Sequence, residues 1–289
     1  DLKTITVCGG FGMSVITALT AQNTLGVQGI HEVPAAFVAA QFDSVLSDIG
    51  ADAAKTGMLA SEEILDVVAA KIRQYGIEKL VVDPVMVAKG GASLIRGEVR
   101  DVLIRELLPL AYVVTPNIPE AEVLAQIKIA GVDDMKRAAE AIFRRGPRSV
   151  LIKGGHLAGN RQAVDILLDG GGFREFSGEL FDTADTHGTG CTYSAAIATG
   201  LGKGKALAEA VDEAKRYITE AIRHALRIGG GHGPTNHFAP VGVLLERQRC
   251  LGKLEAALQR LLEEPAGVII PEVSSNLGYA VPDAKEIAD

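Results

Sequence analysis

The sequence predicts an α/β fold in which a mainly parallel sheet is covered by helices on both faces. Short apolar runs rich in Val, Ile and Leu alternate along the chain with longer segments whose apolar residues recur every three to four positions. Strands that are separated by helices are joined by crossovers, which make the strands parallel and place the helices against the sheet. The 289 residues, of which 47% are apolar, are enough to bury such a sheet.

The predicted strands are short and lie between helical segments. They are Ser14–Ala18, Leu80–Val82, Tyr112–Thr115, Val150–Lys153 and Ala163–Leu168. The last strand runs into Asp169-Gly170-Gly171-Gly172, which is followed by Phe173–Phe176. This glycine-rich turn predicts a hairpin within the otherwise parallel pattern.

The clearest predicted helix is Ser61–Tyr75. Ser61 can cap its first turn, its apolar residues have helical spacing, and Gly76 follows where a helix commonly ends. The other predicted helices are Glu98–Leu108, Pro119–Leu124 (with Pro at the first position), Asp133–Arg145, Gly190–Gly202, Leu207–Arg227 and Leu244–Leu262. Because the pattern changes near Pro240, we expect one domain over residues 1–240 and a remainder, 241–289, too short for its own core.

Composition and charge exclude several classes of protein. Lys and Arg number 29 against 36 Asp and Glu, and they are not clustered, so we expect no nucleic-acid binding. The apolar runs are shorter than the roughly 18 residues of a membrane span. Cys8, Cys191 and Cys250 lie far apart, which favours a reducing, cytoplasmic setting over disulfides or structural zinc. The chain shows no secretory signal and opens at Asp1 rather than Met, so we expect a piece of a longer protein.

One segment is typical of an anion site. Thr186-His187-Gly188-Thr189-Gly190-Cys191 leads directly into a predicted helix. Its two glycines let backbone N–H groups converge, and the positive end of the helix dipole attracts an anion. The same potential favours a thiolate, so Cys191 is a candidate base or nucleophile. Taken alone, the segment is explained equally well as an ordinary glycine-rich turn with a buried cysteine.

Polar side chains follow three other predicted strands. Lys153 and two glycines end one strand, where the ammonium can reach a nucleotide phosphate. Asp83 ends a second strand, and Asn117 and Glu120 follow a third. Two carboxylates at neighbouring strand ends provide the oxygen ligands that Mg²⁺ prefers, directly or through water.

Each of these side chains also has a simpler structural explanation. Lys153 could be a solvated loop residue, Asp83 the first residue of an Asx turn, and Glu120 an acid that stabilises a helix N-terminus. Their common position favours a functional interpretation. All follow strands of one predicted sheet, and ligands bind at the carboxyl ends of such strands.

These motifs, in this order over residues 1 to about 238, resemble those of the hydroxymethylpyrimidine/phosphomethylpyrimidine kinases of thiamine biosynthesis, which belong to the ribokinase-like superfamily. The resemblance is carried by Asp1–Thr4, Gly12–Thr24, Lys55–Leu59, Asp83–Met86, Thr115–Asn117 with Glu120, Lys153–His156 and Thr186–Cys191. It implies a three-layer α/β/α ribokinase-like fold and a homodimer. The implied activity is transfer of the ATP γ-phosphoryl group to the hydroxymethyl group of the pyrimidine, and then to the resulting monophosphate.

The resemblance also implies roles for single residues. The substrate-side positions match an acid at Asp1 and pocket residues at Gln22, Met58 and Val85. The nucleotide positions match Lys153, Asn117, Asp83 and Glu120, and the last two also match the Mg²⁺ positions. Cys191 stands where other ribokinase-like kinases carry an Asp base, and the anion hole matches Gly188, Thr189 and Gly190.

Two features depart from the simplest kinase pattern. Family members normally begin with a strand and a glycine-rich segment just before the position of Asp1, and neither occurs here. Residues 270–284 resemble the start of the thiamine-phosphate synthase domain that is fused behind this kinase in some proteins.

Three alternative functions stay open. A pyridoxal kinase of the same superfamily is disfavoured by Ala21–Thr24, which matches the pyrimidine enzymes. A non-catalytic pyrimidine sensor is disfavoured by the intact phosphate-binding residues. A sugar or nucleoside kinase is disfavoured because Cys191 replaces the usual Asp.

Overall fold

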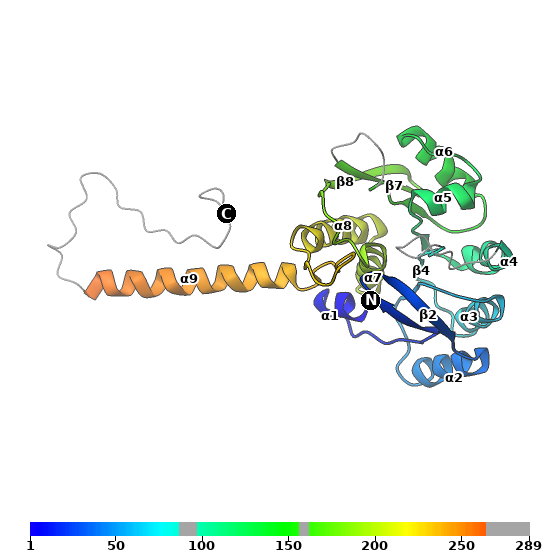
Figure 1. The fold of residues 1–289 in the computed structure, drawn as a ribbon, viewed down its shortest axis with the longest axis horizontal. Helices are drawn as coiled ribbons and strands as arrows, with labels where there is room; N and C mark the ends of the chain where they lie inside the picture. Colours follow the sequence, from blue (N-terminus) through cyan, green and yellow to red (C-terminus); the bar gives the residue numbers. More distant parts are fainter. Residues whose placement is uncertain (87–96, 156–161, 264–289) are drawn as a thin grey trace. The chain divides into compact units, whose positions relative to one another are not determined.

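The computed structural model of the chain describes residues 1–86, 97–155 and 162–263 (Figure 1). The chain divides into two compact units, Asp1–His237 and Phe238–Asp289. The first unit contains the sheets and the predicted site residues. Of the second unit, the described part is the helix α9 (Ala239–Glu263). The resemblance over residues 270–284 lies outside the described residues.

The first unit is built on a six-stranded sheet with the strand order β3-β4-β5-β6-β7-β8. The strands are β3 (Ala54–Thr56), β4 (Leu80–Val82), β5 (Val113–Val114), β6 (Val150–Ile152), β7 (Gln162–Asp169) and β8 (Gly172–Glu179). β3 to β6 are parallel, whereas β7 and β8 are antiparallel to their neighbours. This confirms the mainly parallel sheet, and the predicted hairpin turn joins β7 to β8 with Asp169 opposite Gly172.

Helices cover both faces of this sheet, as the predicted three layers require (Figure 1). Successive side chains of a strand point to opposite faces. Val82 and Val114 accordingly pack into the apolar cluster of α2 to α6, whereas Val81 and Val113 pack against α7 and α8. These helices are α2 (Ala35–Leu46), α3 (Glu62–Gln74), α4 (Gly97–Val102), α5 (Ile118–Ala125), α6 (Val132–Phe143), α7 (Thr189–Gly202) and α8 (Leu207–Arg223), and α1 (Leu2–Val7) precedes them. Burying one of these Val, Leu or Ile side chains completely stabilises the folded state by roughly 1.5–3 kcal/mol.

The predicted helix at 98–108 is not a single α-helix. α4 ends at Val102 and continues as a π-helical segment, η1 (Leu103–Leu107), and a 3₁₀ turn, η2 (Leu108–Leu110). Pro109 lies inside η2 and cannot donate a backbone hydrogen bond, which is why the regular helix does not continue through it.

The prediction of a strand at Ser14–Ala18 was wrong. The strand β1 spans Ala18–Asn23 and pairs antiparallel with β2 (Gly26–Glu32), forming a separate two-stranded sheet. Upstream of β1, the side-chain amide of Gln41 on α2 takes the place of a neighbouring strand. It accepts from the Ile16 N–H and donates to the Ile16 carbonyl, both at 2.9 Å.

Three helix boundaries also differ from the prediction. Pro119 is the second residue of α5, because the helix begins at Ile118. α8 ends at Arg223, since the chain then turns so that the Leu226 N–H donates to the Pro234 carbonyl. α9 begins at Ala239, so Pro240 stands in its first turn, where a missing N–H costs no helical hydrogen bond.

Candidate active site

The centre of the site is a buried ion pair between Lys153 and Asp83. Asp83 directly follows β4 and Lys153 directly follows β6, so both lie at the carboxyl edge of the parallel strands. The Lys153 Nζ lies 2.8 Å from the Asp83 Oδ1, with the side chains 14% and 2% exposed. The structure thus brings together two residues that the sequence predicted at separate strand ends.

Asp83 is surrounded by donors. Besides Lys153, the Thr115 hydroxyl donates to its Oδ1 and the Ser194 hydroxyl donates to its Oδ2, both at 3.2 Å. Burial opposes ionisation, but the charges of Lys153 and Lys55 and the hydrogen bonds from Lys153 and Thr115 outweigh it. They hold the pKa of Asp83 below its usual 3.8, so the residue is a carboxylate at neutral pH.

Lys153 is fixed at both its backbone and its side chain. Its N–H donates to the Pro116 carbonyl at 2.8 Å. Burial opposes its charge, but Asp83 and then Glu120 outweigh burial and raise the pKa of Lys153 above its usual 10.5. The site therefore holds a permanent ammonium in a position from which water is largely excluded.

The predicted anion-binding segment lies against this ion pair. Gly188, with a φ of +80°, is the N-cap of α7, and Cys191 is the third residue of the helix. A Cβ on Gly190 would lie 3.3 Å from the Lys153 Nζ and 3.7 Å from the Asp83 Oδ2. The Thr189 hydroxyl donates back to the Thr186 carbonyl at 2.7 Å. The helix N-terminus and the ammonium thus converge on one place.

Asn117 and Glu120 form a capping box at the start of α5. The Asn117 Oδ1 accepts from the Glu120 N–H at 2.9 Å, and the Glu120 Oε2 accepts from the Asn117 N–H at 2.8 Å. The helix-start explanation of Glu120 is therefore correct for its hydrogen bonds. Burial raises the pKa of Glu120, and although Lys153 opposes this change, the negative charge of Asp83 adds to it.

The predicted substrate-side residues are more dispersed. The Asp1 Oδ2 accepts from the Lys55 Nζ at 3.0 Å, and Val85 lies two residues beyond Asp83. The Met58 carbonyl accepts from the Thr17 hydroxyl at 3.1 Å. Gln22 is exposed on β1.

Three polar residues of the site had no predicted role. Thr115 stands directly after β5 and Ser194 one helical turn after Gly190, and both donate to Asp83. Strand-end position and helical spacing are signals that could have found them. Lys55 is on β3, which was not predicted as a strand because Ala-Lys-Thr lacks an apolar run. His156, a part of the Lys153–His156 motif, lies outside the described residues.

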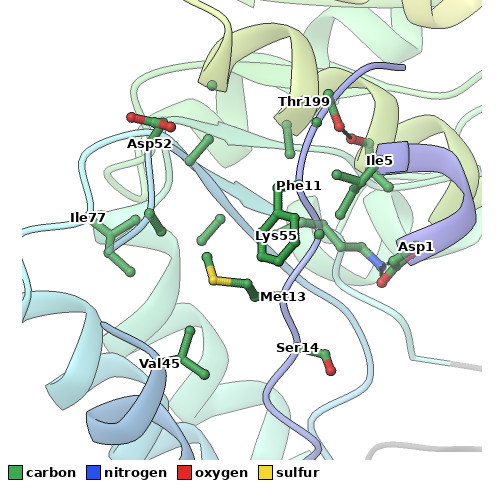
Figure 2. A pocket seen from close by; sticks show the side chains of 18 of the residues that line it. Asp1, Ile5, Phe11, Met13, Ser14, Val45, Asp52, Lys55, Ile77 and Thr199 are labelled. Atoms are coloured by element: carbon green, nitrogen blue, oxygen red, sulfur yellow. Dashed lines mark hydrogen bonds and ion pairs between the residues drawn. The ribbon is translucent and has the colours of Figure 1, made fainter. Parts of the chain in front are cut away.

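A cavity of about 550 Å³ lies along β3 (Figure 2). Met13, Val45 and Ile77 line its apolar part, and Lys55 points toward Asp1 at its other end. Of the predicted site residues, Asp1 alone lines it. This cavity is therefore separate from the place where Lys153, Asp83 and the start of α7 meet.

Neither a metal-binding cluster nor a membrane-spanning helix occurs among the described residues. Over residues 1–86, 97–155 and 162–263, no three His, Cys, Asp or Glu side chains are grouped closely enough to hold a metal ion. Within the same residues no helix combines the length and the apolar character that crossing a membrane requires.

The sequence also matches a known family over most of its length. Residues 1–236 match the family model described as phosphomethylpyrimidine kinase. The chain belongs to the phosphomethylpyrimidine kinase family. This family assignment covers the whole first unit except its last residue.

Two relatives indicate how much of a protein the chain represents. It is 56% identical over 238 residues to the thiamine biosynthesis bifunctional protein ThiED of Geobacter sulfurreducens. The match covers 82% of this chain and 48% of that protein. The chain thus matches about half the length of this bifunctional relative. It is 46% identical over 239 residues to the hydroxymethylpyrimidine/phosphomethylpyrimidine kinase of Bacillus subtilis, covering 83% of this chain and 88% of that protein.

Solved structures show the same ribokinase-like α/β fold. The phosphomethylpyrimidine kinase of Clostridium difficile superposes with a TM-score of 0.69 at 46% identity, covering 77% of this chain and 91% of that chain. An ADP complex of Bacillus subtilis pyridoxal kinase superposes with a TM-score of 0.76 at 35% identity. The match covers 83% of this chain and 91% of that chain. Phosphomethylpyrimidine kinase family members therefore share their fold with pyridoxal kinases.

Proposed function

We propose that this chain transfers the γ-phosphoryl group of ATP to 4-amino-5-hydroxymethyl-2-methylpyrimidine and then to its monophosphate, in thiamine diphosphate biosynthesis. The observation that carries the proposal is the Lys153 ammonium, held by Asp83 against Gly190 at the start of α7. Phosphoryl transfer depends mainly on positioning and on neutralising phosphate charge. A buried cation next to a helix N-terminus provides both.

In this proposal the phosphates lie between Lys153 and the start of α7. The ammonium pairs with phosphate oxygens, and the backbone N–H groups of Gly188, Thr189 and Gly190 donate to the equatorial oxygens of the transferred group. Asn117 binds the nucleotide from the start of α5. Use of ATP is supported by the AMP-PCP complex of the Staphylococcus aureus pyridoxal kinase, whose chain is 35% identical to this one.

The proposal includes Mg²⁺ near Asp83 and Glu120, and the residues present fit a hydrated ion. A cation would relieve the repulsion through which Asp83 raises the pKa of Glu120. Asp83 already accepts from Lys153, Thr115 and Ser194, so it fits contact through water better than direct ligation. When bound, Mg²⁺ neutralises charge on the phosphates.

Cys191 is the proposed base for the hydroxymethyl group, since it stands in the first turn of α7 beside the proposed anion hole. Asp1, Gln22, Met58 and Val85 are the proposed pyrimidine contacts. Gln22 is exposed on β1, so its side chain is accessible to a ligand.

The test is ATP- and Mg²⁺-dependent phosphorylation of hydroxymethylpyrimidine phosphate by the 289-residue chain, followed with radiolabelled ATP. We expect turnover that is lost in Lys153→Met. Binding of the pyrimidine without turnover by the wild-type chain would contradict the kinase proposal and support the sensor.

Pyridoxal kinase is the second candidate, because pyridoxal kinases superpose on this chain with a TM-score of 0.76. Competition between pyridoxal and hydroxymethylpyrimidine for the same chain separates the two activities. Preferential turnover of pyridoxal would overturn the substrate assignment and leave the family assignment intact.

We also propose that the protein is a homodimer in a reducing, cytoplasmic compartment. Leu19 and Ile30 on the β1–β2 sheet and Phe37 on α2 are exposed apolar side chains, which a second copy could cover. Cys8, Cys191 and Cys250 are free, which supports a reducing setting. Light scattering of the purified chain measures the oligomeric state, and a monomer at micromolar concentration would contradict the dimer.

A further inference from the structure

A second buried ion pair lies on the α7–α8 side of the sheet. The Lys215 Nζ on α8 donates to the Asp165 Oδ2 on β7 at 2.7 Å, with the side chains 9% and 3% exposed. A Cβ on Gly178 of β8 would lie 2.9 Å from the Lys215 Cε, so the lysine side chain passes close to the β8 backbone. The charged pair therefore lies between β7, β8 and α8, next to the apolar cluster of α7 and α8.

The second oxygen of Asp165 holds the backbone next to Lys153. Its Oδ1 accepts from the Gly154 N–H at 3.0 Å, in a fully buried position. Lys153 itself donates its N–H to the Pro116 carbonyl at 2.8 Å. The two successive N–H groups are thus fixed from opposite sides, one by the loop after β5 and one by a side chain of β7.

The same contact explains why β6 ends at Ile152. A Cβ on Gly154 would lie 1.9 Å from the Val164 carbonyl oxygen, so the chain after Lys153 passes very close to β7. The Asp165 carboxylate accepts a hydrogen bond from the Gly154 N–H, which would otherwise continue the pairing of β6 with β7.

A buried ion pair does not by itself imply added stability, because desolvation of the two charges offsets their attraction. This pair therefore calls for another explanation.

We propose that Asp165, held by Lys215, is a positioning residue that fixes the backbone at 153–154 and so directs the Lys153 ammonium at the phosphates. The inference rests on the proposed role of Lys153. Asp165 touches neither substrate nor nucleotide in this proposal. Its effect is transmitted through the one hydrogen bond that it accepts from the Gly154 N–H, and Lys215 holds the carboxylate in place.

Two double variants separate positioning from charge burial. Asp165→Leu with Lys215→Met and Asp165→Asn with Lys215→Met both remove the buried charges, so neither leaves an unpaired ion. Only the asparagine keeps an oxygen that can accept from the Gly154 N–H. Ile218→Ala, a buried position of α8 that does not contact Gly154, controls for loosening of the same interface.

We expect the leucine double variant to have a kcat/KM for ATP roughly 10- to 100-fold below that of the asparagine double variant, because small misplacement of a positioned group is costly in rate. Thermal melting should show both folded. Adding Lys153→Met should abolish the difference between them, since no ammonium is left to position. Ile218→Ala should not reproduce the loss.

Equal kcat/KM values for the two folded double variants would overturn the inference, as would a difference that persists without Lys153. If the leucine variant fails to fold, the asparagine variant with Lys153 intact provides the measurement, and a loss as large as that of Lys153→Met would overturn the inference. Full activity of Lys153→Met alone would instead refute the role of Lys153 in the proposed function, which is a distinguishable result.

Discussion

The Lys153 ammonium lies 2.8 Å from the Asp83 carboxylate, although 70 positions separate the two residues in the sequence. The sheet brings them together because β4 and β6 are parallel and flank β5, so their carboxyl ends meet at one edge. Because neither charge is well solvated, each residue depends on the other for its ionised state.

Removing one partner of this pair should damage both stability and activity. Lys153→Met leaves Asp83 charged, buried and without its main partner, which costs about 3–5 kcal/mol of unfolding free energy. Asp83→Asn together with Lys153→Met should recover most of that stability, because neither member of the pair is left charged without the other. Denaturant unfolding of the three proteins measures the effect.

The same variants should separate folding from catalysis. We expect the double variant to remain roughly 10²–10³-fold below wild type in kcat/KM for ATP, as is typical when one electrostatic donor to a transition state is lost. Activity that returns together with stability would show that Lys153 acts only in folding.

The Lys153–Asp83 pair should also give a characteristic pH dependence of stability. The pKa of Asp83 lies below its unfolded value of 3.8, so its contribution is present above that value and is lost as the pH falls through the folded pKa. The pKa of Lys153 lies above 10.5, so its contribution is present below that value and is lost as the pH rises through the folded pKa. The difference in unfolding free energy between wild type and the double variant should therefore be constant from about pH 5 to 9 and change only outside that range. A slope within it would contradict the assigned shifts.

Gly154 should tolerate no side chain. In Gly154→Ala the new Cβ would lie 1.9 Å from the Val164 carbonyl oxygen, a backbone atom that cannot move aside alone. We expect a loss of about 3 kcal/mol or more of unfolding free energy from this overlap.

Gly155→Ala is the matched control for Gly154→Ala. Among the described residues its Cβ would meet the Ala163 Cβ alone, at an ordinary 3.9 Å, so we expect a change within about 0.5 kcal/mol. Similar melting temperatures for the two alanine variants would show that β6 and β7 are not packed as described.

Cys191→Ala should affect the two phosphorylation steps unequally. A general base contributes about 10²–10⁴-fold when the acceptor is a hydroxyl that must lose its proton. In the second step the acceptor is already a phosphate anion, so the loss there should be smaller. Separate initial rates with hydroxymethylpyrimidine and with its phosphate measure both losses, and equal losses would argue against Cys191 as the base.

Asn117 offers a test that separates helix capping from nucleotide binding. Asn117→Asp keeps an oxygen that can accept from the Glu120 N–H, so the stability of α5 should be retained. It replaces the amide by a negative charge close to the proposed phosphates, which should raise the KM for ATP. Asn117→Ala should cost about 1 kcal/mol of stability through loss of the cap. An unchanged KM in Asn117→Asp would confine this residue to the capping box.

The sequence by itself determined the elements that local chemistry specifies. Ser61 is the N-cap position of α3, although its side chain makes no capping hydrogen bond, and Gly76 follows the C-cap Tyr75. The glycine-rich turn at 169–172 marks the β7–β8 hairpin. The strand-end positions of Asp83, Lys153 and the start of α7 indicated that these groups would share one edge of the sheet. These features depend on caps, turns and periodicity, which act over a few residues.

Only the tertiary structure decided which partners those groups take. β3 is a strand because it pairs with β4, and Ser14–Ala18 is not one because Gln41 hydrogen-bonds its backbone. The same is true of Thr115 and Ser194 around Asp83, and of Asp165 beneath Gly154. Such contacts join residues far apart in the chain, and a buried charge or N–H is stabilised by whichever donor or acceptor the folded chain brings to it. Local sequence specifies where a polar group stands, whereas packing specifies what that group meets.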